Sequence, residues 1–154
     1  MSDTLIGVLV TEMLKLAPSA EQAESLLATI RACNAAANRA AEVAFEHRTA
    51  NKIAVQKLVY GELRAEFGLS AQMAILAVHK ACGAYKRDKS TKPVFRPDGA
   101  IAYDQRILSW KGRDRVSILT LGGRIIVPVV YQGRWATALA DRIRGQADLV
   151  YRDG

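Results

Sequence analysis

Residues that could bind phosphate groups are concentrated in one part of the chain. Between positions 80 and 115, ten lysine and arginine residues face only four aspartates, an excess of six out of the chain's net charge of +7. The ten are Lys80, Lys86, Arg87, Lys89, Lys92, Arg96, Arg106, Lys111, Arg113 and Arg115. Such a cluster is typical of a protein that binds a polyanion such as nucleic acid, although helix ends and surface loops also carry solvated lysines and arginines. Tyr103 and Trp110 lie among these charges, where they could stack on bases or sugars.

The residue types that catalysis needs are not gathered in the same way. Two acidic pairs are spaced four apart and share helix faces, which is typical of a surface: Glu42 with Glu46, and Glu62 with Glu66. His47 and His79 have no serine, cysteine or aspartate at a useful spacing, so we expect them at exposed or helix-end positions. Gly122 and Gly123 precede a strand pattern and not a helix, which is wrong for a phosphate-binding loop. We expect no catalytic residue, metal ligand or cofactor in this chain.

Composition places the chain among compact domains that neither enter nor cross a membrane. At 154 residues, half of them hydrophobic, it can form one domain or one domain with a smaller insertion. Its start has no signal-peptide pattern, and its apolar runs are far below the ~18 residues of a membrane helix, so we expect a cytoplasmic protein. Cys33 and Cys82 occupy small-residue positions in helical patterns and are predicted to be buried thiols.

Three helices are predicted before the basic region. Ser19 is a suitable N-cap for a helix that runs to about His47 with a face rich in alanine. A second helix fits 51–67 and stops at Gly68. Ser70 caps a third helix, whose end carries Lys86, Arg87 and Lys89 beside the negative pole of the helix dipole.

Strands are predicted on both sides of these helices. The expected ranges are 4–16, 100–109, 115–121, 124–130 and 146–152, with a short helix or turn at 134–143. Gly122-Gly123 is the expected hairpin turn, and the proline-rich segment 92–99 is a connector. The simplest α+β architecture is a small β-barrel (wedge-like) made of a first strand (1–17) and a later part (91–154). A three-helix domain (18–90) is then inserted after that strand. An α+β domain without closure is the alternative.

Several segments resemble one known family. They read LSAQM at 69–73, AYKR at 84–87, PVF at 93–95, YDQRILS at 103–109, RVSILTLGGR at 115–124 and ADLVYRDG at 147–154. Together they are similar to the amino-terminal half of TnpB-like transposon-encoded RNA-guided DNA endonucleases, which are related to type V CRISPR effectors. The resemblance covers nearly the whole chain and is most specific at 93–128.

The resemblance implies a wedge domain with an inserted recognition domain that grips guide RNA and the RNA–DNA heteroduplex. It also implies that the carboxylates for magnesium and the cysteines for zinc belong to a RuvC-like nuclease domain that would follow this segment. We therefore expect a non-catalytic RNA- and DNA-binding module. Two other readings stay open: half of a split or truncated nuclease that needs a RuvC-containing partner chain, and a protein-interaction domain. The resemblance does not specify the identity of the guide RNA or of the motif that flanks the target.

The residues expected to touch nucleic acid are basic residues of the 80–115 region and its two aromatic residues. They are Lys86, Arg87, Lys89, Lys92, Arg96, Tyr103, Arg106, Trp110, Lys111, Arg113 and Arg115. Phosphate contacts by the basic side chains would supply most of the affinity.

Overall fold

A computed structural model of the chain describes residues 15–112, 114–130, 147–149 and 151, and the described part is an α+β fold. A short strand β1 (Lys15–Leu16) is followed by the helices α1 (Ala20–Glu46), α2 (Lys52–Ala65) and α3 (Ala71–Arg87). The remaining strands are β2 (Ile101–Tyr103), β3 (Leu108–Lys111), β4 (Arg115–Thr120), β5 (Gly123–Val130) and β6 (Ala147–Leu149).

The three predicted helices are confirmed, and each begins where a side chain caps its free N–H groups. Ser19 and Gln22 form a reciprocal capping box at the start of α1. Asn51 and Ser70 accept hydrogen bonds from backbone N–H groups in the first turns of α2 and α3. Gly68 has a φ of 70°, which lets the chain turn sharply between α2 and α3.

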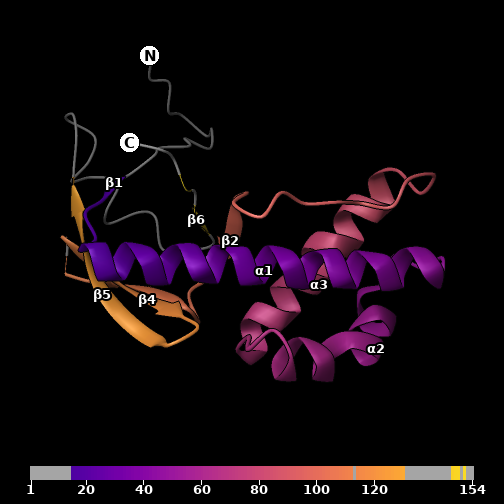
Figure 1. The fold of residues 1–154 in the computed structure, drawn as a ribbon, viewed down its shortest axis with the longest axis horizontal. Coiled ribbons are helices and arrows are strands. Elements are labelled where there is room, and N and C mark those ends of the chain that lie inside the picture. Colours follow the sequence, from indigo (N-terminus) through magenta and orange to yellow (C-terminus); the bar gives the residue numbers. More distant parts are fainter. Residues whose placement is uncertain (1–14, 113, 131–146, 150, 152–154) are drawn as a thin grey trace, which may run out of the picture.

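Helix α1 contacts both of the other helices and two of the strands, β2 and β4. Its 27 residues extend over roughly 40 Å. Alanines on its inner face are completely buried, which allows α3 to approach closely. Figure 1 shows α1 along the length of the molecule, with β4 and β5 beside its first half and α2 and α3 beside its second half. The helix is therefore a common support for strands and helices.

Two side chains of α1 connect it to the hairpin formed by β4 and β5. The amide of Gln22 donates to the carbonyl of Ile126 at 2.9 Å. The buried hydroxyl of Thr29 accepts from the N–H of Leu121 at 3.1 Å. These bonds hold the hairpin against the first half of the helix.

The described strands form two separate antiparallel sheets, and neither closes into the barrel that we expected. One sheet has the order β1-β5-β4-β3, and the other is the pair β2-β6. The single strand expected at 100–109 is divided because Asp104 forms a turn. Its side chain accepts from the N–H of Arg106, and its carbonyl accepts from the N–H groups of Ile107 and Leu108. This turn separates β2 from β3, so the two strands belong to different sheets.

The hairpin is present, but its turn is one residue earlier than predicted. Thr120 pairs with Gly123, so Leu121 and Gly122 form the turn. The positive φ that the turn requires, 119°, belongs to Gly123. The hydroxyl of Thr120 donates to the carbonyl of Gly123 and accepts from the N–H of Gly122, which stabilises this register.

The expected strand at 4–14 and the helix or turn at 134–143 lie outside the described residues. Of the strands expected at 4–16 and 146–152, the described parts are β1 and β6. Among the described helices, none combines the length and apolarity needed to cross a membrane.

Candidate nucleic-acid interface

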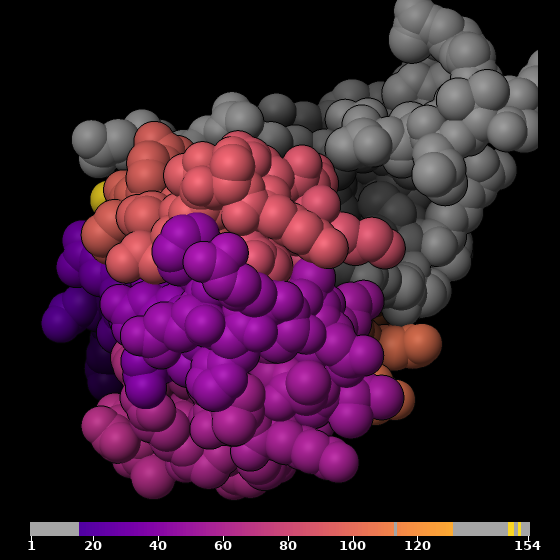
Figure 2. Space-filling view, turned by 90° about the vertical axis from the view of Figure 1, so that its right-hand side faces the viewer, coloured from indigo at the N-terminus to yellow at the C-terminus, as the bar shows by residue number. Residues whose placement is uncertain are grey.

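Five of the predicted phosphate-binding residues lie together at the end of α3 and in the segment that follows it. We call Lys86, Arg87, Lys89, Lys92 and Arg96 the helix-end cluster. All five are exposed, and the first two occupy the last turn of α3. Figure 2 views this end of the molecule, where the segment after α3 lies above α1 and α2.

The positive charges of the helix-end cluster have no ion-pair partners among the described carboxylates. None of the five forms an ion pair with another described residue. Asp88 lies among them, but its carboxylate accepts two hydrogen bonds from Ser90, which shape the loop and lower its pKa. By contrast, Arg39 on α1 binds Glu62 at 2.8 Å and Glu42 at 3.1 Å. The helix-end cluster can therefore offer its charges to phosphate groups.

A second group of predicted residues lies at the turn between β3 and β4. Lys111 and Arg115 are exposed and face each other across the two strands, and we call them the sheet-turn cluster. Arg115 lies 3.9 Å from the carboxylate of Asp114, so its charge is partly balanced. Arg113 is outside the described residues.

The sheet-turn cluster lies near the start of α1, whereas Lys86 and Arg87 lie near its end and Arg96 lies beside its middle. Near the helix-end cluster, the ring of Tyr85 packs edge-to-face against Phe45 in the last turn of α1, with ring centroids 6.2 Å apart. Near the sheet-turn cluster, Arg115 pairs with Pro128, whose carbonyl accepts from Ala17, just before α1 begins. These residues are close together in the sequence, but the fold separates Lys86 and Arg87 from the sheet-turn cluster by about the length of α1. The start of α3 lies near the strands, where Gln72 donates to Asp104, and its end lies near the end of α1.

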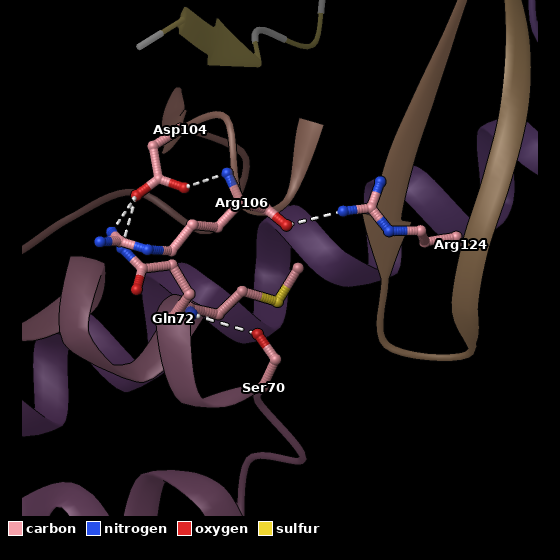
Figure 3. A network of polar contacts seen from close by, with 6 residues as sticks. Ser70, Gln72, Asp104, Arg106 and Arg124 are labelled. Carbon is pink, nitrogen blue, oxygen red and sulfur yellow. Dashed lines mark hydrogen bonds and ion pairs between the residues drawn. The ribbon is translucent and has the colours of Figure 1, made fainter. Parts of the chain in front are cut away.

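Arg106 belongs to neither cluster and lies in a network beside the start of α3 (Figure 3). Its guanidinium is 3.5 Å from the carboxylate of Asp104, which also accepts from the amide of Gln72. Its carbonyl accepts from Arg124 at 2.6 Å. The side chain of Arg106 is still 74% exposed. It can therefore reach a phosphate while its backbone helps to hold the 104–107 turn.

The two predicted aromatic residues differ in burial. Tyr103 has no exposed surface, and its hydroxyl donates to the carbonyl of Leu119 at 2.8 Å. Burial also raises the pKa of Tyr103. Tyr103 is therefore a core residue, and the expectation that it could stack on a base is wrong for this conformation. Trp110 in β3 is partly buried against the core, which leaves part of its ring at the surface.

A polar connection between α1 and the segment that follows α3 was not predicted from the sequence. Asn34 is fully buried and donates to the carbonyls of Pro97 and Gly99, at 3.1 and 2.8 Å. One turn later, Asn38 donates to the carbonyl of Phe95 and accepts from its N–H. The spacing of four residues places both amides on one helix face, and this was the only signal in the sequence.

Lys80 belongs to the same connection, and it is not part of the charged surface. Its ammonium donates to Asn34 at 2.7 Å and to the carbonyl of Ala100 at 2.8 Å. It also lies 4.9 Å from the centre of the Phe95 ring. Burial lowers its pKa, and the negative charge of Asp148 partly offsets this effect. Lys80 therefore helps to hold the 95–100 segment against the helices.

The titratable residues outside these clusters show no catalytic arrangement in the described part. His47 caps the end of α1, His79 lies on α3, and both are exposed as expected. Cys33 and Cys82 are buried free thiols, as predicted, and burial raises the pKa of Cys33 to about 12. Among the described residues, no three histidine, cysteine or acidic side chains are grouped to hold a metal ion.

Comparisons with known proteins assign no family: no family model matches the chain, and no curated protein matches it.

Proposed function

We propose that this chain is a nucleic-acid-binding module that grips RNA, or an RNA–DNA heteroduplex, mainly through phosphate contacts of the helix-end cluster. We further propose that it is the non-catalytic half of a TnpB-like RNA-guided DNA endonuclease. In that case the helices form the recognition part, and the strands belong to a wedge-like part that a closed barrel would complete.

One observation carries the proposal. Five exposed basic side chains occur within eleven positions, 86–96, and none of them is engaged in an ion pair with a described residue. Holding like charges together is unfavourable unless an anion binds them, and a phosphate backbone supplies regularly spaced anions. The residues of the sheet-turn cluster lie too far along α1 to share the same few phosphates. They would contact a different stretch of a longer nucleic acid.

A protein-interaction domain is the second candidate, and the outer face of α2 favours it. Ile53 is 68% exposed and Leu58 is 52% exposed, although both are large apolar residues. A partner that covers this face would remove apolar surface from water. Such a partner could also be a RuvC-containing chain that completes a split nuclease.

The dependence of affinity on salt tests the proposal. If the five charges of the helix-end cluster each neutralise one phosphate, log affinity should fall with log salt at a slope of about −3.5 for single strands and about −4.5 for duplexes. Fluorescence anisotropy with a labelled RNA of about 20 nucleotides, between 50 and 400 mM salt, measures that slope. A slope near zero would contradict the proposal and favour the protein-interaction domain.

A further inference from the structure

A pocket of about 380 Å³ lies between α1, α3, β2 and β6. Its wall is mostly apolar and includes Met73, Leu76, Ala77 and Ile101. The polar atoms deeper in the wall are not available for chemistry. Cys33 is kept as a neutral thiol because burial raises its pKa to about 12, and the hydroxyl of Tyr103 is bonded to Leu119. The pocket is therefore suited to binding and not to reaction.

Two side chains of opposite charge line the same pocket. Lys80 is held in place by its bonds to Asn34 and Ala100, which use two of its three N–H donors. Asp148 lies on β6 opposite Ala102, two residues along β2 from the carbonyl that Lys80 binds. That distance along a strand is about 7 Å. Asp148 is exposed and makes no hydrogen bond with another described residue, so no described residue occupies its carboxylate.

A ligand that fits this pocket needs a flat apolar body and one edge that both accepts and donates hydrogen bonds. We propose that the pocket binds an unpaired guanine base, with its O6 atom accepting from Lys80 and its N1–H and N2–H groups donating to Asp148. Guanine has an acceptor beside two neighbouring donors, and the two donors match the two oxygens of a carboxylate. In uracil the single N–H lies between two carbonyls, which a carboxylate repels. Adenine and cytosine each offer one amino group beside a ring nitrogen acceptor.

The guanine must be unpaired, because this contact uses the edge that pairs in a duplex. Unstacked bases of single-stranded RNA present that edge to proteins. The inference rests on the proposed function for the source of the base, since it would belong to the RNA held by the basic clusters. It adds a preference for one base to a protein that otherwise binds mainly through phosphate contacts.

Free nucleosides test the pocket without involving the phosphate contacts. The ¹⁵N-labelled chain is titrated with guanosine, adenosine, cytidine and uridine, and the amide signals of Ala77 and of residues 101–103 are followed by NMR. We expect guanosine to shift these signals at a concentration about tenfold lower than the other three. Equal responses to all four nucleosides, or no response to guanosine, would overturn the inference.

Two variants and one control test the assignment of residues. Asp148→Asn should weaken guanosine binding about tenfold, because the amide replaces one acceptor by a donor. Ala102→Leu should abolish the response by filling the pocket, and its NMR spectrum shows directly whether the chain remains folded. Asp98→Asn removes an exposed carboxylate that does not line the pocket and should leave guanosine binding unchanged. An equal loss in Asp148→Asn and Asp98→Asn would also overturn the inference.

The outcome is separate from that of the proposed function. If the chain binds RNA with a steep salt slope but does not respond to guanosine, the guanine-site inference is rejected and the proposed function is retained. A guanosine response without salt-dependent RNA binding would reject the phosphate contacts and support the pocket as a nucleoside site.

Discussion

Reversing the charge of the helix-end cluster should weaken RNA binding far more than an equal change elsewhere. The test variant carries Lys86→Glu, Arg87→Glu and Lys89→Glu. The matched control carries Arg31→Glu, Lys52→Glu and Lys57→Glu, all at exposed positions without ion pairs among the described residues. Both variants lower the net charge by six units, so they differ only in where the charge changes. Arg39 is unsuitable as a control because it binds Glu42 and Glu62.

The size of the effect follows from how many phosphate groups the test variant no longer neutralises. On single-stranded RNA each neutralised phosphate contributes about 0.7 to the salt slope, so removing three of five should change the slope from about −3.5 to about −1.4. If the electrostatic part of binding vanishes near 1 M salt, affinity at 0.1 M should fall on the order of 100-fold. The control leaves all five residues of the helix-end cluster in place, so its salt slope should be unchanged and its affinity should fall about threefold at most.

Folding of the test variant can be verified separately. Lys86 and Arg87 lie in the last turn of α3, where replacing cations by anions costs about 0.3–1 kcal/mol each. This loss should lower the unfolding midpoint in urea without unfolding the protein. Equal losses of RNA affinity in the two folded variants would refute the reasoning, because binding would then depend on net charge and not on this cluster.

Four further predictions concern stability and reactivity. Asn34→Ala should lower the free energy of unfolding by about 3 kcal/mol, measured in urea. The substitution removes three hydrogen bonds, including the bond from Lys80 to α1. A decrease of less than about 1 kcal/mol would contradict this. Arg48→Gly should raise the free energy of unfolding by about 1 kcal/mol, because Arg48 has a φ of 51° after the end of α1; a destabilised variant would show that its side chain has another role. Cys33 should not react with iodoacetamide at pH 8.5 until the chain unfolds, because its raised pKa of about 12 leaves almost no thiolate. Mass spectrometry measures the rate of modification, and a rate equal to that of a free thiol would disprove this. The same raised pKa means that the unfolded chain loses its thiol proton first, so stability should decrease as the pH rises above 9.

Local features of the sequence were sufficient to predict the helices. Ser19 and Ser70 lie at their caps, and Gly68 has the positive φ that ends the second helical region. The hairpin was also recognisable, since Gly123 supplies its unusual φ. These features depend on neighbours within a few residues, which sequence patterns describe well.

Long-range arrangement could not be predicted in the same way. The division at Asp104 depends on a side chain that bonds its own backbone, and hydrophobic periodicity does not record that choice. The separation of Arg96 from Arg115 depends on the direction in which α3 packs along α1. Burial of Tyr103 depends on where Leu119 places its carbonyl. Sequence patterns predicted which residues carry charge but not which of them share a surface.

The amides of Asn34 and Asn38 hold the segment 95–99 by its main-chain atoms alone. A peptide group offers the same donor and acceptor whatever side chain it carries. Side chains that are exposed on this segment, such as Arg96, are therefore replaceable at little cost to folding. Main-chain atoms therefore attach segment 95–99 to α1, whereas its exposed side chains determine what the segment can bind. Substitutions at these exposed positions can thus change what segment 95–99 binds while its position on α1 remains the same.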